Sequence, residues 1–149
     1  MIKSILFFLI VMTSCNSSKV TPEQSNLNFD VILERATGGR IEKEIVIISD
    51  QNALKSIYNE LNLSQEPSYE VPIINFETEL AIVFFMGQKN TGGHNISVKS
   101  INESEKYVIL NYEEKGPKPT DMVTMVITQP YCLVKIKKPS KELKFTQVE

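Results

Sequence analysis

One stretch of the chain constrains the fold more than any other, namely residues 80–86, which read LAIVFFM. All of these residues are apolar, and several of them favour strands. A strand with one face in water alternates apolar and polar residues, whereas this run does not alternate. The pattern therefore predicts a central strand that is buried on both faces, with a helix packed on one of them.

The other predicted strands are residues 29–34, 41–48, 96–101, 107–112, 123–128 and 132–137. Those at 29–34, 123–128 and 132–137 alternate, as half-buried strands are expected to, and the one at 41–48 ends in a β-branched run. Gly38 and Gly39 lie between the strands at 29–34 and 41–48, and a glycine pair favours the tight turn of a β-hairpin. The alternation from Cys132 to Lys137 predicts an antiparallel strand with one face in water.

A single helix is predicted after residue 50. Ser49 or Asp50 provides an N-cap, because a short polar side chain can accept hydrogen bonds from the first free backbone N–H groups. One apolar stripe at helical spacing contains Leu54, Ile57, Tyr58 and Leu61. The predicted fold class is therefore α+β, a mostly antiparallel curled β-sheet of about seven strands with a single packed α-helix.

The beginning of the chain predicts where the protein is located. Lys3 precedes an apolar run at residues 5–11, which is too short to span a bilayer. Met12, Thr13 and Ser14 follow and lead into Cys15. This arrangement resembles the signal of a bacterial lipoprotein, in which the preceding residues are removed and Cys15 carries the lipid. Ordinary secretion, with Cys15 present by chance, is the alternative.

The lipoprotein interpretation divides the chain into three parts. Residues 1–14 are the signal peptide, and the polar residues 15–28 predict a flexible tether. Residues 29–149 then form one domain. We therefore expect a protein of the bacterial cell envelope that is attached to a membrane through its lipid, without a choice of leaflet.

Composition limits the classes of partner. The chain has 16 basic and 18 acidic side chains and a formal net charge of −2. A nucleic-acid-binding domain needs a basic face, so no nucleic-acid partner is expected. If Cys15 is lipidated, Cys132 has no partner for an intramolecular disulfide. Its apolar neighbours predict that Cys132 is a small buried hydrophobic residue.

Three motifs in the second half occur in the same order in one known family. They are residues 87–96 (GQKNTGGHNI), 115–117 (KGP) and 128–136 (TQPYCLVKI). In these motifs the chain resembles the C-terminal domain of the PrcB family, named for an accessory subunit of a bacterial surface protease complex. The resemblance is clearest over residues 80–138. Many relatives have a tyrosine after the two glycines, where this chain has His94.

The resemblance implies a non-catalytic protein that binds a protease or another exported protein. It implies no cofactor, and it supplies no catalytic residues. His94 is the one histidine, so a hydrolase that uses it as a base is an alternative. Another alternative is a small-ligand binder with a cleft between helix and sheet. One histidine and one free cysteine give no recognisable ligand spacing, so no metal site is predicted.

The least generic segments are the candidates for partner binding. They are Thr91, Gly92, Gly93 and His94 in one segment, and Pro130 and Tyr131 in the other. Successive backbone N–H groups around the glycines could hold an anion, although a plain turn explains them equally well. Proline is confined to strand starts, bulges and edges, so the second segment is expected at an edge or bend. We expect both segments at one rim of the sheet.

Overall fold

The computed structural model describes residues 25–149, so the predicted signal peptide, Cys15 and most of the predicted tether lie outside the described residues. The strands are β1 (Ser25–Leu27), β2 (Phe29–Arg35), β3 (Lys43–Ile48), β4 (Glu79–Met86), β5 (Asn95–Glu103), β6 (Tyr107–Lys115), β7 (Tyr131–Lys137) and β8 (Glu142–Val148). Helix α1 (Gln51–Leu61) and the 3-10 helix η1 (Asn62–Ser64) lie between β3 and β4. The predicted α+β class is confirmed.

The strands form two sheets, and the predicted single curled sheet of seven strands is wrong. One sheet has the order β1-β5-β6-β8 and the other has the order β2-β7-β4-β3. Neighbouring strands are antiparallel, except that β6 and β8 are parallel. The physical reason for a second sheet is that β4 and β7 each present apolar side chains on both faces, and one helix covers only one of these faces.

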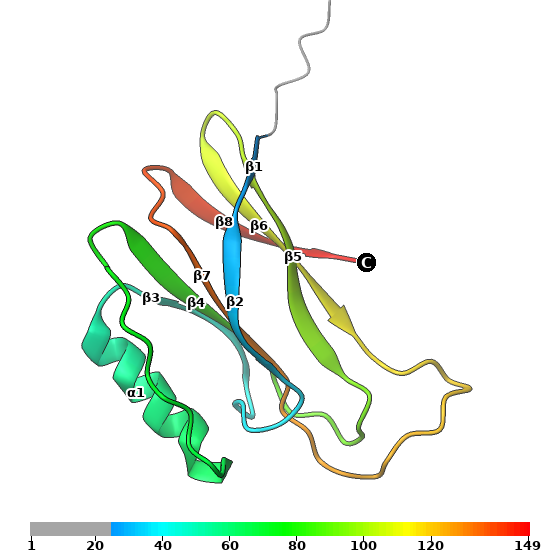
Figure 1. Ribbon diagram of the computed structural model, residues 1–149. Coiled ribbons are helices and arrows are strands. Elements are labelled where there is room, and N and C mark those ends of the chain that lie inside the picture. Colours follow the sequence, from blue (N-terminus) through cyan, green and yellow to red (C-terminus); the bar gives the residue numbers. More distant parts are fainter. Residues whose placement is uncertain (1–24) are drawn as a thin grey trace, which may run out of the picture.

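Two apolar cores result, one on each face of the β2-β7-β4-β3 sheet. The core between the two sheets contains Ile82, Phe84, Leu110 and Val134, among others. The core under the helix contains Leu54, Tyr58, Val83 and Leu133, among others. Figure 1 shows α1 beside β3 and β4, on the side away from β5 and β6. The prediction that residues 80–86 form a strand buried on both faces is confirmed.

The helix begins and ends as its sequence predicts. The Asp50 side chain accepts hydrogen bonds from the backbone N–H groups of Asn52 and Ala53, both at 2.9 Å. Asn62 is the C-cap. The predicted stripe faces the sheet and is buried, with Leu54 and Tyr58 at most 1% exposed. Within the described residues, no helix has the length and apolar character needed to cross a membrane.

The predicted hairpin at Gly38 and Gly39 is wrong, because β2 pairs with β7 and β3 pairs with β4. Gly38 has a φ of +91°, which suits a turn, whereas Gly39 permits a close approach between two chain segments. The Gly39 N–H donates to the Gln129 carbonyl at 3.0 Å, and a Cβ on Gly39 would lie only 2.7 Å from that oxygen. Gly39 therefore holds the chain against the residues just before β7. The chain then crosses to β3, which lies at the opposite edge of the sheet from β2.

Three further predictions are corrected. Residues 123–128 are not a strand, and β8 lies in the tail after residue 137, where no strand was predicted. β1 lies inside the range predicted as a tether. β7 has no fully wet face, since Leu133 is completely buried and the Lys135 side chain is 27% exposed. In each case the deciding factor is the neighbouring strand, which the local sequence does not specify.

Candidate functional site

The predicted Thr91–His94 segment lies in the loop of residues 87–94, which joins β4 to β5. This 87–94 loop is held by the longer loop of residues 116–130, which joins β6 to β7. The Gly92 N–H donates to the Thr124 carbonyl at 2.9 Å, and the Thr128 hydroxyl donates to the Thr91 carbonyl at 2.8 Å. Lys89 and Thr128 exchange two backbone hydrogen bonds at 2.8 and 2.9 Å. The two loops therefore form one unit at one end of the sandwich.

The His94 side chain lies at the base of this unit, next to Thr91 and Gly116. Its Nε2 lies 3.2 Å from the Thr91 hydroxyl, and its Nδ1 is buried without a hydrogen-bond partner among residues 25–149. A Cβ on Gly116 would lie 3.1 Å from that Nδ1, so only glycine fits here without displacement. The arrangement places a hydroxyl next to a base, but the described residues place no carboxylate on Nδ1 to orient the ring. Ser97 is buried with no partner for its hydroxyl within the same range.

The glycines of the 87–94 loop have two different roles. Gly93 has a φ of +83°, a conformation that residues with a Cβ rarely adopt. Gly92 lies against Thr124, whose hydroxyl would be 2.4 Å from an added Cβ. The plain interpretation of the glycines as turn formers therefore holds for Gly93, while Gly92 permits contact with the 116–130 loop.

Pro130 and Tyr131 are placed next to this unit but not on its surface. β7 is an internal strand, and both residues are buried, with Tyr131 only 1% exposed. The Tyr131 ring packs 6.2 Å from that of Phe85, and burial raises the pKa of the Tyr131 hydroxyl. The prediction of an edge position is wrong, and burial removes these two side chains from the proposed contact surface. Proline is tolerated at this point because it precedes the first residue of the strand.

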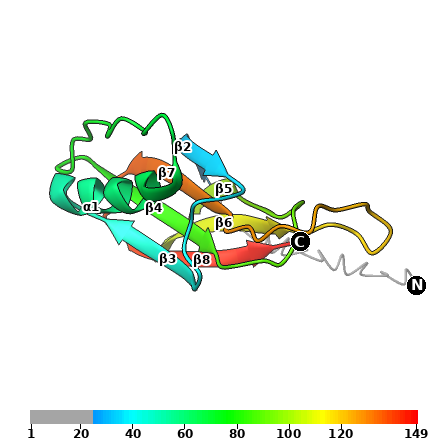
Figure 2. The ribbon, with the colours of Figure 1, turned by 90° about the horizontal axis from the view of Figure 1, so that it is seen from below.

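The residues that sequence reasoning missed are the apolar ones in the second half of the 116–130 loop. Met122 is 100% exposed, Met125 81%, Val126 52% and Ile127 61%. Their alternation with threonine was the available signal, and it predicted a half-buried strand. Figures 1 and 2 show this loop, coloured orange, projecting away from the sandwich. The residues are therefore exposed because the loop leaves the body of the protein.

A hollow of about 560 Å³ lies between the base of this loop and the 87–94 loop. Its lining comes from Gly93 on one side and from residues 115–117 and 120–123 on the other. A tight turn forms part of this lining, and in it the Asp121 carboxylate accepts from the Lys118 N–H at 2.8 Å. Met122 and Val123 contribute apolar side chains to the lining, and Lys115 and Asp121 contribute charged ones.

The charge around the two loops is mostly positive. Lys115 and Lys118 are exposed and Lys89 is partly exposed, and none of them makes an ion pair within residues 25–149. Asp121 is the one carboxylate of the 116–130 loop, and it is engaged by a backbone N–H. This end therefore combines exposed apolar side chains with free positive charge, although the whole chain is slightly acidic.

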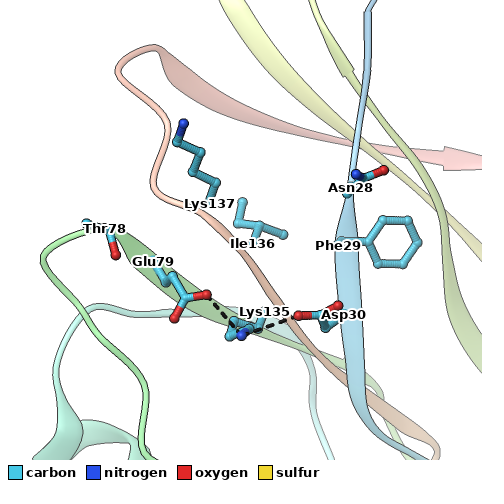
Figure 3. A pocket seen from close by; sticks show the side chains of 8 residues that line it. All are labelled: Asn28, Phe29, Asp30, Thr78, Glu79, Lys135, Ile136 and Lys137. Carbon is cyan, nitrogen blue, oxygen red and sulfur yellow. Dashed lines mark ion pairs between the residues drawn. The ribbon is translucent and has the colours of Figure 1, made fainter.

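A second hollow, of about 360 Å³, lies among β2, β4 and β7 (Figure 3). Its centre is Lys135, whose ammonium group lies 2.9 Å from Glu79 and 3.3 Å from Asp30. The hydrogen bond to Glu79 and, to a smaller extent, the one to Asp30 raise the pKa of Lys135. Because Lys135 pairs with carboxylates on the two neighbouring strands, this cluster joins β2, β7 and β4.

The free cysteine among the described residues is Cys132. Cys132 is completely buried, and burial raises the pKa of its thiol to about 11, so it is not a reactive thiolate near neutral pH. The prediction that it is a buried hydrophobic residue is confirmed. Among the residues from 25 onward, no group of three histidine, cysteine, aspartate or glutamate side chains is arranged to hold a metal ion.

The region that contains both loops matches a known family. The family model described as PrcB C-terminal matches residues 80–137, from β4 to the end of β7. This part of the chain is similar to the PrcB C-terminal family. The resemblance seen in the sequence motifs is thereby confirmed over this range, and the PrcB C-terminal segment includes His94 and the exposed apolar residues. No curated protein and no solved structure gives a significant match to the chain.

Proposed function

We propose that this protein is a non-catalytic lipoprotein of the bacterial envelope that binds another exported protein, such as a protease. The contact surface is the exposed part of the two loops, residues 91–94 and 122–127. The observation that carries the proposal is the exposure of Met122, Met125, Val126 and Ile127 on one projecting loop.

Exposed apolar side chains in a cluster need an explanation, whereas single ones do not. Methionine is enriched in the central parts of protein interfaces, and loops on a rigid scaffold commonly carry binding residues. The two hydrogen-bonded loops provide such a scaffold, since Thr124 and Thr128 tie the projecting loop to β4 and β5 through residues 87–94. These observations support protein binding over small-molecule binding.

The proposed membrane attachment rests on Cys15. Each buried methylene of an acyl chain contributes about 0.8 kcal/mol, so more than one chain gives stable attachment without a spanning helix. Replacing Cys15 with serine in the full chain is expected to move the protein from the membrane fraction to the aqueous fraction. Retention of C15S in the membrane fraction would contradict the anchor, and it would leave the contact surface to be tested separately.

The binding proposal is tested by crosslinking in the native cell, followed by purification of the membrane-bound protein. The double variant Met125→Asp with Ile127→Asp is expected to lose the crosslinked partner. Ile73→Asp is the matched control, because Ile73 is 96% exposed but lies in the segment between η1 and β4. Equal recovery of the partner by the double variant and the control would contradict the proposed surface.

A hydrolase that uses His94 is the second candidate, and the 3.2 Å contact between His94 and the Thr91 hydroxyl favours it. Here threonine would be the nucleophile and His94 the base. Screening hydrolytic substrates with the native chain, His94→Gln and Thr91→Val separates the two functions. An activity that both substitutions abolish, in variants with unchanged thermal unfolding, would replace the binding proposal.

A further inference from the structure

We propose that residues 122–127 are an unpaired β-strand edge, which pairs with an extended apolar segment of the partner that carries acidic residues at its ends. This inference rests on the proposed function and names the kind of partner segment. It commits to backbone pairing, in which main-chain hydrogen bonds give affinity and alternate side chains give specificity.

The hydrogen bonds of this segment define an occupied side and an open side. Thr124 and Thr128, four residues apart, both bond to the 87–94 loop. In an extended chain, alternate residues direct their backbone groups to the same side. In the extended conformation that the proposal assigns to this segment, Met125 and Ile127 direct their N–H and C=O groups away from the 87–94 loop, and neither N–H donates a hydrogen bond to residues 25–149. These N–H groups are therefore available to a further strand.

The sequence of the segment agrees with this use. Residues 123–128 read VTMVIT, in which five of the six residues are β-branched and favour strands. Elsewhere in the described chain such segments are paired, as β3 is with β4. A local preference that the fold leaves unused is expected at functional sites. The segment therefore has the composition of a strand and lacks only a partner.

The lysines near residues 122–127 indicate the charge of the partner segment. Lys115 lines the hollow next to Met122, at one end of the segment, and Lys89 pairs with Thr128 at the other end. A partner segment with acidic residues at both ends would place opposite charges near these lysines. A second copy of this chain would instead bring two sets of lysines together. Charge complementarity thus favours another protein over self-association.

The test uses a synthetic peptide as the probe, with alternating valine and threonine in the middle and glutamates at both ends, about ten residues in all to match a strand. Hydrogen exchange of the full chain is expected to show new protection at the amides of Met125 and Ile127 when the peptide is bound. A peptide with lysines in place of the glutamates is expected to bind at least about tenfold more weakly. N-methylation of the alternate peptide amides that face residues 122–127 is expected to abolish binding, because it removes the donors of the ladder, whereas methylation of the outward-facing set removes none of them.

A variant completes the test. Met125→Pro removes one backbone N–H from the open side. It is expected to weaken binding of the glutamate peptide at least about tenfold. Ile73→Pro, at the exposed control position, is expected to have no effect. Unprotected amides at saturating peptide, equal binding of the lysine peptide, or self-association through this segment in sedimentation experiments would each overturn the proposal. A native partner that still crosslinks to Met125→Pro with undiminished yield would also overturn it, while leaving the proposed function intact.

Discussion

Strand β4 and residues 122–127 have similar amino-acid patterns and opposite surroundings. In β4, Val83 and Phe84 are completely buried between two apolar cores. In the 116–130 loop, Met122 and Met125 are 100% and 81% exposed. The difference is that β4 has hydrogen-bonded strands on both sides, β3 and β7, whereas residues 122–127 contact one loop. Apolar, β-branched sequence indicates a preference for extended backbone, and neighbouring strands decide whether that backbone is buried.

The largest expected effect concerns the buried member of this comparison. Phe84 packs against the rings of Tyr112, at 5.2 Å, and Phe145, at 5.7 Å. Phe84→Ala removes these contacts and leaves a cavity between the two sheets, so the free energy of unfolding is expected to fall by about 3–5 kcal/mol. Chemical denaturation measures this change. Phe84→Leu, which retains most of the volume, is the control and is expected to cost less than half as much.

The next prediction compares two glycines at close approaches. An added Cβ on Gly39 would meet the Gln129 carbonyl at 2.7 Å, and backbone cannot move aside without disturbing the start of β7. Gly39→Ala is therefore expected to cost about 1–3 kcal/mol of unfolding free energy. An added Cβ on Gly92 would meet only the hydroxyl of the exposed Thr124 side chain, which can rotate. Gly92→Ala is expected to cost less than about 1 kcal/mol, and a larger loss than that of Gly39→Ala would contradict the comparison.

Sequence reasoning succeeded where one segment contains its own signal. Residues 80–86 lack alternation, which predicts burial on both faces, and Asp50 followed by the stripe from Leu54 to Leu61 predicts a capped amphipathic helix. Both features depend on local backbone geometry and on the period of apolar residues. The burial of Cys132 is also a local inference from its apolar neighbours.

Sequence reasoning failed where strand pairing or a backbone contact joins segments that are far apart in the sequence. Glycines 38 and 39 have the composition of a hairpin turn, yet their place is set by Gln129, which lies 90 residues further along the chain. β8 pairs in parallel with β6, and this pairing turns a mostly polar tail into a strand whose Phe145 packs on the core. Residues 123–128 show the converse, because a strand-like sequence stays single when the fold provides no neighbour. For the same reason, the exposed part of the candidate site could not be found from the sequence.

The junction between the helix and β4 gives a smaller, pH-dependent effect. Arg40 donates to both carboxylate oxygens of Glu60, at 2.8 and 2.9 Å, and its guanidinium lies 4.8 Å from the ring centre of Phe85. The hydrogen bonds from Arg40 lower the pKa of Glu60 below its ordinary value of 4.5, against the opposing effect of burial. A carboxyl group whose pKa is lower in the folded than in the unfolded state stabilises the fold at pH values above its unfolded-state pKa. This contribution is lost as the pH falls through its folded-state pKa.

Stability measured between pH 7 and pH 3 is therefore expected to fall less steeply below about pH 4.5 in Glu60→Gln than in the native chain. The difference is expected to stay below about 1 kcal/mol, because the pair is partly exposed and water screens it. Glu77→Gln, at an exposed carboxylate on the segment before β4, is the control and is expected to follow the native curve. Coincident native and Glu60→Gln curves would show that the Arg40 contact does not contribute to folding.

The smallest expected effect on stability concerns the exposed member of the opening comparison. Met125→Ser and Ile127→Ser remove apolar side chains that are already mostly in water, so each is expected to change the free energy of unfolding by less than about 0.5 kcal/mol. Val83→Ser, at a fully buried position of β4, is the control that shows what the same kind of change costs inside the core. A loss above 1 kcal/mol in either loop variant would mean that these side chains are buried in the isolated protein. Unchanged stability together with weaker partner binding would instead show that residues 122–127 are retained for binding, because folding alone gives no reason to keep apolar side chains on a projecting loop.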